Sequence, residues 1–517
     1  MNSNRNPFYT LFFLLSVMAV LLLISLIFPE KGILLVDGIK LKFPSAKSLL
    51  SNDKPEYASI PEVVAKADTT SLNVLTEKEI NSNINTIGKI ETDTIASEKK
   101  LFKPFKKDDT EPVKQDELKS QRIEFANNNP AVLYNFFKGL ENSRATGKAL
   151  RIVHYGDSQI EGDRISGFIR ERLQSRFGGG GPGLVPAFKI YNQASVTHEN
   201  SGDWFRYTIF GKVNKAVNHK RYGAMCAFSK FTAVEKDSLF LTDTIVASAS
   251  YNTQSSIYPS AKKFQRVKIY YGSSENAIEL NVFKDNELHS SYILSEKNNL
   301  NIKTIDFDNA ENNISLVFKG TKSPDIYGVS LEMPYGVSVD NIAMRGGSGT
   351  VFNKMDKGIL SEMLKDLETE LIMMQFGGNV LPYIKDEKAC KDYGSWFYSQ
   401  LVTLKAAKPG VSIIVIGPAD MSIKKENYFE TYPYLEEVRD ALKEAAFKAG
   451  AGFWDMYKAM GGRNSMPSWV AANPPLASTD YVHFSPRGAR IIAELFYEAL
   501  NYEYENYRFK NVEASKE

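Results

Sequence analysis

Ser158 and the pair Asp480 and His483 are the side chains in this sequence best suited to nucleophilic catalysis. Ser158 follows Gly156-Asp157, and Asp480 precedes His483 by three positions. A serine hydroxyl becomes a strong nucleophile when a histidine ring nitrogen accepts its proton. An acidic residue bonded to the other ring nitrogen fixes the tautomer and stabilises the imidazolium. The sequence therefore supplies a candidate nucleophile, base and orienting acid.

A second group of residues could stabilise negative charge on a reacting oxygen. Asn379 ends the motif Gly377-Gly378-Asn379, and a side-chain amide can donate a hydrogen bond to an oxyanion. The two glycines allow the backbone to approach a ligand closely. The glycine-rich segment 345–349 and the backbone of Ser158 offer further N–H donors. These groups predict an oxyanion-binding site.

Each motif also has a simpler structural explanation. Serine is a common N-cap of helices, and on its own this explains Ser158 better than catalysis does. Asp480 and His483 alone suit a solvated turn, and the glycine motifs suit ordinary turns. Only their order in the chain and their placement within one fold make them a specific signal.

The segments around these motifs alternate between short apolar strands and amphipathic helices. The sequence predicts strands at 150–155, 371–376, 411–416 and 452–455. It predicts helices at 133–140, 165–173, 386–407, 435–449 and 486–502. This alternation predicts an α/β fold with a parallel sheet covered on both faces. Ligands bind at the carboxyl ends of the strands in such sheets, where the motifs above lie.

Between about residues 192 and 334 the pattern changes to strands separated by turn residues. The predicted strands are 267–271, 278–282, 314–318 and 329–332. Their spacing predicts a small β-sandwich that interrupts the α/β domain. Trp204, Phe205 and Tyr207 could form a sugar-stacking platform, but aromatic residues of a β-sandwich more often belong to its core.

The N-terminal segment is strongly apolar and is followed by a polar stretch. Residues 9–28 carry no charge, and about 20 apolar residues in a helix span a bilayer. Arg5 and the terminal amine favour a cytoplasmic N-terminus. A cleaved signal peptide is the alternative, but its apolar region is usually shorter and ends in small residues. Residues 31–120 predict a juxtamembrane hairpin around Asp37-Gly38 and then a flexible tether.

The composition excludes several other classes of function. Lys+Arg 63 against Asp+Glu 61 gives a net charge of +2, so no overall field indicates nucleic-acid binding. Two cysteines, Cys226 and Cys390, exclude a disulfide framework and a cysteine-based zinc site, and whether they pair is left open.

Histidine is scarce, with five in the chain. His154, in the first predicted strand, is expected in the core or behind the site. Three others fall in or near the predicted β-sandwich and are expected at the surface: His198, His219 and His289. Only His483 combines an acidic neighbour at the right spacing with a suitable place in the fold. No cluster of metal ligands is evident, and we expect neither a metal nor a cofactor.

Together these motifs resemble the SGNH (GDSL) hydrolase family, in which four sequence blocks supply Ser, Gly, Asn and His. Ser158 matches the first block, with Gln159 in place of the usual leucine. Gly346 matches the second block, with Gly347 as the alternative. Asn379 matches the third, although Val380 replaces a frequent aspartate, and Asp480 with His483 matches the fourth.

The resemblance implies a three-layer, flavodoxin-like fold and hydrolysis or transfer of an ester-linked acyl group. A β-domain inserted between the first two blocks is similar to bacterial peptidoglycan O-acetylesterases, in which the insert resembles a carbohydrate-binding module. It implies Ser158, His483 and Asp480 as catalytic residues, with an oxyanion hole from Ser158, Gly346 and Asn379. The expected substrate is an acetylated glycan, acted on by a membrane-anchored enzyme whose catalytic domain is extracytoplasmic, and periplasmic in a cell with two membranes.

Two alternatives remain at this point. One is an acyltransferase that uses the same residues with a membrane-bound acyl-donor partner, and the other is a non-catalytic glycan-binding protein. The expected organisation is an anchor with its cytoplasmic tip at 1–30, a tether at 31–120, a hydrolase domain at 121–191 and 335–505, an insert at 192–334 and a tail at 506–517.

Overall fold

The computed structural model describes residues 7–29, 33–36, 39–41, 43, 56–59, 63, 121–236, 242–295 and 299–514. The chain divides into two compact units, of which the larger comprises Tyr57–Lys425 and Phe429–Glu517. All the candidate site residues lie in this larger unit. Most of the predicted tether, and the turn Asp37-Gly38 of the predicted hairpin, lie outside the described residues.

The smaller unit contains the apolar N-terminal helix. Helix α1 runs over Pro7–Ile27, and its segment Phe8–Ile27 has a mean hydropathy of 2.8. Its length and composition suit a bilayer-spanning helix, and a signal sequence has the same properties. Strands β1 (Ile33–Val36) and β2 (Ile39–Leu41) pair antiparallel on either side of the predicted hairpin turn.

A six-stranded sheet forms the centre of the larger unit, in the order β16-β4-β17-β18-β21-β3. Its strands are β16 (Val337–Ala343), β4 (Leu150–Gly156), β17 (Thr369–Gln375), β18 (Ser412–Ile416), β21 (Gly452–Trp454) and β3 (Ile123–Glu124). The first five are parallel, as expected, but β3 pairs antiparallel with β21. The sheet is therefore mixed, and the prediction of a purely parallel sheet is wrong at this edge.

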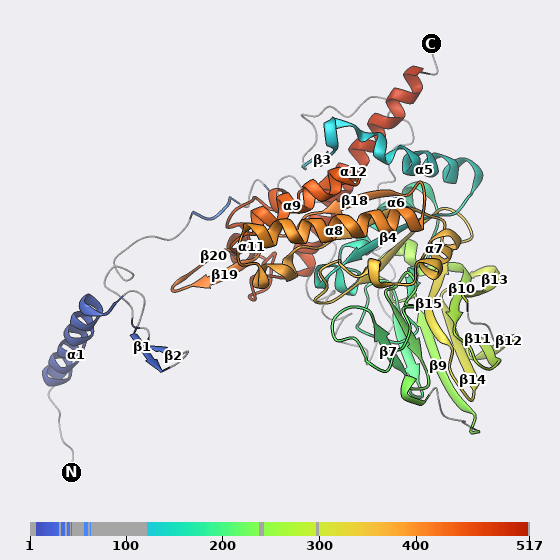
Figure 1. Cartoon of the computed structure of the whole chain (residues 1–517), viewed down its shortest axis with the longest axis horizontal. Coiled ribbons are helices and arrows are strands. Elements are labelled where there is room, and N and C mark those ends of the chain that lie inside the picture. The colour runs from blue at the N-terminus through green and yellow to red at the C-terminus, as the bar shows by residue number, and fades with distance from the viewer. Residues whose placement is uncertain are drawn as a thin grey trace. The chain divides into compact units, whose positions relative to one another are not determined.

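Helices cover both faces of the central sheet. Residues that alternate along β4 belong to different cores, because Ile152 packs in one cluster and Val153 in the other. The Ile152 side is covered by α5 (Tyr134–Thr146), α6 (Ser166–Phe177) and α12 (Pro486–Ala514). The Val153 side is covered by α7 (Lys357–Asp366), α8 (Glu387–Ala407) and α9 (Leu435–Lys448). Figure 1 shows α8 and α9 side by side, and the arrangement is the predicted three-layer α/β fold.

The register of the central strands brings three motif-bearing loops together. Gly156 at the end of β4 lies opposite Ala343 of β16 on one side and Gln375 of β17 on the other. The segments that follow these three residues therefore leave the same edge of the sheet. The register thus places residues 157–158, 344–349 and 376–379 in one neighbourhood.

The chain between α6 and β16 forms two antiparallel sheets with a shared apolar core. One sheet has the order β13-β10-β15-β8-β7, with β5 pairing against β15, and the other has the order β12-β11-β14-β9-β6. The strands are β5 (Gly183–Val185), β6 (Thr197–Ser201), β7 (Phe205–Thr208), β8 (Ala227–Lys230), β9 (Ile245–Asn252), β10 (Phe264–Gly272), β11 (Ile278–Lys284), β12 (Glu287–Leu294), β13 (Asn301–Glu311), β14 (Asn313–Gly320) and β15 (Asp325–Glu332). We call this segment the β-insert.

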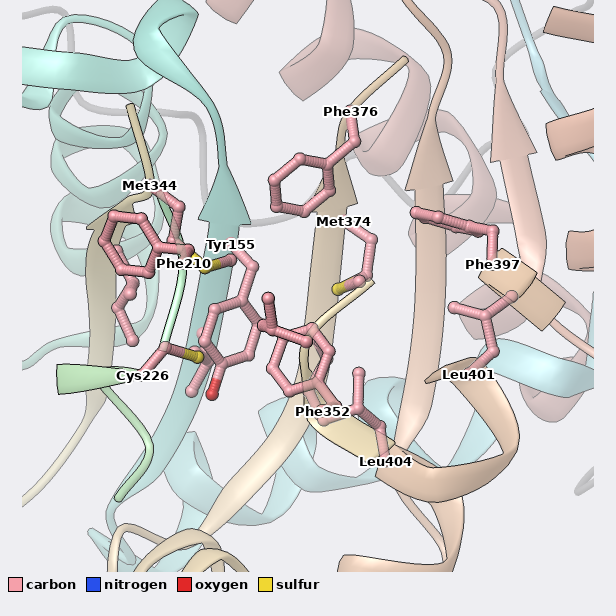
Figure 2. Close-up of a cluster of buried hydrophobic side chains, with 14 of the residues drawn as sticks. Tyr155, Phe210, Cys226, Met344, Phe352, Met374, Phe376, Phe397, Leu401 and Leu404 are labelled. Atoms are coloured by element: carbon pink, nitrogen blue, oxygen red, sulfur yellow. The ribbon is translucent and has the colours of Figure 1, made fainter. Parts of the chain in front are cut away.

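The β-insert shares a buried core with the central sheet. The ring of Tyr155 on β4 packs against Phe352, with 4.9 Å between ring centroids, and its hydroxyl donates to the carbonyl of Ala224 at 2.8 Å. Figure 2 shows Tyr155 between Phe352 and the β-insert residue Cys226. Cys226 and Cys390 are both free, which answers the question of whether they pair.

A buried ionic network also joins the β-insert to the central sheet. Arg151 on β4 donates to Asp340 of β16 at 2.5 Å and to Glu332 of β15. Asp340 also accepts from the backbone N–H of Leu184 at 2.8 Å. The three charged side chains are at most 6% exposed, so each depends on the others for its charge compensation.

The structure corrects the expected surface position of His198. This side chain is buried and stacks on Tyr251 at 4.5 Å between ring centroids. It lies on β6, a strand that the sequence patterns did not indicate. Trp204 is half-buried and packs edge-on against the core residues Phe231 and Phe318, as expected for an aromatic residue at the core of the β-insert rather than on an open platform.

Candidate active site

Ser158 lies two residues after the end of β4 and is the first residue of a short 3-10 helix over Ser158–Asp163. The cap of this helix is Asp157, whose carboxylate accepts from the backbone N–H of Gln159 at 2.9 Å. Because Asp157 fills this role, the hydroxyl of Ser158 is not used for capping. The simpler explanation of Ser158 as an N-cap is therefore wrong.

Asp480 and His483 form a compact turn just before α12. The carboxylate of Asp480 accepts from the backbone N–H groups of Val482 at 2.9 Å and His483 at 3.0 Å. Its other oxygen lies 2.7 Å from Nδ1 of His483. Partial burial opposes the charged form of Asp480, but these hydrogen bonds hold its pKa below the usual range. Asp480 is therefore a carboxylate that orients the His483 ring.

The remaining ring nitrogen of His483 reaches the candidate nucleophile. Nε2 of His483 lies 2.8 Å from Oγ of Ser158. With Nδ1 directed at Asp480, the tautomer that protonates Nδ1 leaves Nε2 free to accept the serine proton. The structure thus brings together the three residues that the sequence offered as nucleophile, base and orienting acid.

Asn379 lines the same cavity as the candidate nucleophile Ser158 and lies in the 3-10 helix Gly378–Tyr383 that follows β17. Its Nδ2 is 3.1 Å from Oδ2 of Asp157 and 3.2 Å from the carbonyl of Gly347. Burial raises the pKa of Asp157 to about 6, against the hydrogen bond from Gln159 and the nearby charge of His483. The Asn379 amide therefore connects the turn that carries Ser158, residues 157–164, which we call the nucleophile turn, to the glycine-rich loop at 345–349.

The geometry separates the two candidate glycines. The N–H of Gly347 donates to the carbonyl of Met344 at 2.7 Å within a turn, so it is already engaged. Gly346 has φ +72° and is exposed, and a Cβ added there would meet no atom within 4 Å. Neither glycine is among the residues that line the cavity beside Ser158, so the two differ here in the engaged N–H of Gly347 and the exposure of Gly346.

A cavity of about 210 Å³ opens beside these residues. Its polar side carries Ser158, His483 and Asn379, and its other walls come from the loops after β17, β18 and β21. The remaining lining residues are Asp157, Gln159, Gln375, Phe376, Gly378, Pro382, Tyr383, Pro418, Ala419, Met421, Met456 and Val482. A small group bound there would lie directly against the Ser158 hydroxyl.

His154 has the expected buried position behind the site. Its ring nitrogens lie 2.8 Å from Oγ of Ser166 and 3.2 Å from Oε1 of Gln375. Burial lowers its pKa to about 3, so the ring is neutral. His154 supports Gln375, which lines the cavity, and does not face the Ser158 hydroxyl.

Two residues of the nucleophile turn have contacts that the sequence patterns did not reveal. Gln159 hydrogen-bonds to the backbone on both sides of His483, at Val482 and Phe484, and Arg164 donates to the carbonyl of Phe484. The replacement of the family's leucine by Gln159 was the available signal, since a buried carboxamide needs hydrogen-bond partners. Among the residues that the structure describes, no group of three or more His, Cys, Asp or Glu side chains is arranged to hold a metal ion.

Part of the chain matches a known protein family. Residues 318–491 match the family model of the GDSL-like lipase/acylhydrolase family. The match includes Gly346, Asn379, Asp480 and His483, whereas Ser158 precedes it on the other side of the β-insert. No curated protein matches the sequence.

A solved structure shows the same fold. A peptidoglycan O-acetylesterase superposes with a TM-score of 0.55 and 20% identity, over 71% of this chain and 95% of that one. A family two carbohydrate esterase from Clostridium thermocellum matches with a TM-score of 0.21 and 9% identity, over 57% and 97% of the two chains. The carbohydrate acetylesterase Est24 from Sinorhizobium meliloti matches with a TM-score of 0.23 and 11% identity, over 32% and 78%. The last two TM-scores are below 0.5, and we base no conclusion on them.

Proposed function

We propose that this chain, a serine ester hydrolase with a GDSL-like lipase/acylhydrolase domain, removes O-acetyl groups from a carbohydrate, with peptidoglycan as the leading candidate. The observation that carries the proposal is the hydrogen-bonded series from Ser158 through His483 to Asp480, with distances of 2.8 and 2.7 Å. This series opens onto a cavity at the carboxyl ends of the central strands, where ligands bind in such sheets.

In the proposed reaction, Oγ of Ser158 attacks the acetyl carbonyl while Nε2 of His483 takes its proton. The negative charge that develops on the carbonyl oxygen is held by the backbone N–H groups of Ser158 and Gly346 and by the amide of Asn379. The sugar oxygen then leaves and takes the proton from His483. The products of this half-reaction are the free sugar hydroxyl and an acetyl ester on Ser158.

The second half-reaction uses the same residues with water as the nucleophile. His483 takes a proton from water as its oxygen attacks the acetyl carbonyl, and Asp480 stabilises the imidazolium. The collapse of this intermediate returns the proton to Oγ of Ser158 and releases acetate. Neither half-reaction needs an electron donor or a further co-reactant.

The proposal places this reaction outside the cytoplasm, with α1 as a membrane anchor. An uncharged helix over Pro7–Ile27, preceded by Arg5, favours a cytoplasmic N-terminus and an exported catalytic domain. Residues 31–120 would then act as the tether between the anchor and the catalytic domain. The mass of the mature N-terminus tests this part, because a signal peptide would be removed and an anchor retained.

The central experiment incubates the full-length chain with O-acetylated peptidoglycan and measures both free acetate and acetyl groups on the glycan. We expect acetate to accumulate with the wild type and not with Ser158→Ala. As a control, Ser361→Ala removes a hydroxyl that only caps the carbonyl of Ala407. A net gain of labelled acetyl on the glycan would contradict hydrolysis and indicate an acyltransferase. Equal acetate release by Ser158→Ala would exclude the proposed nucleophile.

A further inference from the structure

Gln159, which directly follows the candidate nucleophile, holds both sides of the candidate base. Its Nε2 donates to the carbonyl of Val482 at 2.6 Å, and its Oε1 accepts from the backbone N–H of Phe484 at 3.4 Å. The two partners are the residues immediately before and after His483. Gln159 is 8% exposed, so its carboxamide has few alternatives to these bonds.

Arg164 makes a second connection between the same two segments. One of its terminal nitrogens donates to the carbonyl of Ser158 at 2.7 Å, and the other donates to the carbonyl of Phe484 at 3.2 Å. Its Nε donates to the carbonyl of Glu161 at 2.8 Å, which fixes the guanidinium plane within the nucleophile turn. One planar group therefore ties the backbone of the nucleophile to the backbone next to the base.

His483 lies in a loop over residues 478–484, which we call the base loop. Contacts within this loop cannot set the distance between His483 and Ser158. Asp480 is three residues from His483, so their bond orients the ring relative to the loop and not relative to the central sheet. The bond from the N–H of Ser478 to the carbonyl of His483 at 2.8 Å is equally local. The base loop must therefore be held against the end of β4 by other groups.

Other contacts of the base loop, made by Tyr481, connect it to a different part of the fold. The N–H of Ser422 donates to the carbonyl of Tyr481 at 3.0 Å, and the ring of Phe429 stacks on that of Tyr481 with 3.5 Å between centroids. These contacts tie the loop to the β19 (Ser422–Lys425) and β20 (Tyr428–Thr431) strands. On the side that faces the nucleophile turn, Phe484 shares an apolar cluster with Ile160, and Gln159 and Arg164 add directional hydrogen bonds to the backbone of the loop.

We propose that Gln159 and Arg164 are positioning residues that hold His483 within hydrogen-bond distance of Ser158. The inference rests on the proposed function, in which Ser158 is the nucleophile and His483 the base. The leucine usual at position 159 in the family could neither donate to the Val482 carbonyl nor accept from the Phe484 N–H. In this chain, the carboxamide of Gln159 therefore helps to fix the position of His483 relative to Ser158.

The test compares the full-length wild type with Gln159→Met, which keeps the length of the side chain and removes both hydrogen bonds. We expect kcat for an aryl acetate to fall about 10- to 100-fold, because loss of the supporting contacts displaces the base. Gln159 also lines the cavity, but methionine has a similar length, so KM should change much less than kcat. Gln265→Met is the matched control. Gln265 likewise makes two hydrogen bonds to the backbone, in its case to the carbonyls of Phe307 and Asp308, but it lies in the β-insert.

Gln159→Glu gives a readout that a merely structural role would not change. The carboxylate can still accept from the Phe484 N–H but cannot donate to the Val482 carbonyl. Its charge beside His483 favours the imidazolium, so the acidic limb of the kcat/KM profile should move to higher pH. A profile identical to that of the wild type would overturn the proposal, even if Gln159→Met proved too unstable to assay.

Labelling by a fluorophosphonate separates failure of this inference from failure of the proposed function. A wild type that is neither labelled at Ser158 nor active would contradict the proposed function. A wild type that is labelled, with Gln159→Met labelled at the same rate and turning over within twofold of it, would contradict the positioning role alone. We expect rapid labelling of the wild type and of Gln265→Met, and slow labelling of Gln159→Met.

Discussion

Nε2 of His483 lies 2.8 Å from Oγ of Ser158, although 325 positions separate the two residues in the chain. Ser158 lies two residues after the end of β4, and His483 lies in a turn that precedes the last helix. Their contact depends on Asp480 for the orientation of the ring and on Gln159 and Arg164 for the position of the loop.

Asp480→Asn should lower kcat by about 10²- to 10⁴-fold. The new side chain keeps an oxygen that can accept from the N–H groups of Val482 and His483, so the turn should persist. Its amide nitrogen cannot accept from Nδ1 of His483, and the ring loses both its tautomer control and its stabilised imidazolium. Steady-state rates with an aryl acetate measure the effect, with Asp392→Asn on the exposed face of α8 as the control. Equal rates for Asp480→Asn and the wild type would exclude the orienting role.

Asn379→Ala should lower kcat by about 10²- to 10³-fold, which corresponds to about 2.7–4 kcal/mol of transition-state stabilisation. The amide lies beside Ser158 and donates to Asp157 and Gly347 in the free enzyme. KM should change little, because the oxyanion forms only in the transition state. Asn353→Ala removes an amide that bonds to Ser399 on the surface and serves as the control. A change confined to KM would contradict an oxyanion role.

Asp157→Asn should alter the pH dependence of stability. Burial raises the pKa of Asp157 from 3.8 to about 6, so its proton stabilises the folded chain. This contribution is fully present below about pH 4 and is lost as the pH rises through 6. At pH 7.5 the ionised carboxylate costs about 3 kcal/mol that the neutral asparagine does not.

Unfolding in urea at pH 4 and pH 7.5 measures this difference. The free energy of unfolding of Asp157→Asn, relative to that of the wild type, should improve by about 3 kcal/mol between the two pH values. The comparison is made within each pH, so the other titrating groups cancel. A relative stability that does not depend on pH would show that Asp157 has an ordinary pKa.

Arg151→Met should destabilise the fold by about 3–5 kcal/mol, because it leaves Asp340 and Glu332 buried without their cation. Since Arg151 lies on β4 and Glu332 on β15, the loss falls on the junction between the central sheet and the β-insert. Arg266→Met breaks a bidentate pair with Asp306 at the surface and should cost at most about 1 kcal/mol. Urea unfolding distinguishes the two, and equal losses would contradict the structural role of the buried network.

The elements that were predicted correctly are those with a strong local pattern. The buried run at 150–155 became β4, and the amphipathic stretch beginning after Asp386 became α8, with Asp386 as its cap. Strand β16 was not predicted, because its polar residues Asp340 and Asn341 interrupt the apolar run. Both are buried, and Asp340 is compensated by Arg151, a partner 189 positions away. The apolar pattern alone could not anticipate a strand that depends on such a distant charge.

The sequence by itself determined the types of groups available for chemistry and the local elements that carry them. Serine after Gly156-Asp157, the Asp480–His483 spacing and the alternation of strands and helices are local features, and they indicate the GDSL-like lipase/acylhydrolase domain whose family model matches residues 318–491. Only the tertiary structure decided that Asp157 caps the turn in place of Ser158, that Gly347 has its N–H engaged, and that Gln159 holds the base loop. These outcomes depend on strand order and register, which bring together segments hundreds of residues apart, and no local periodicity encodes such contacts.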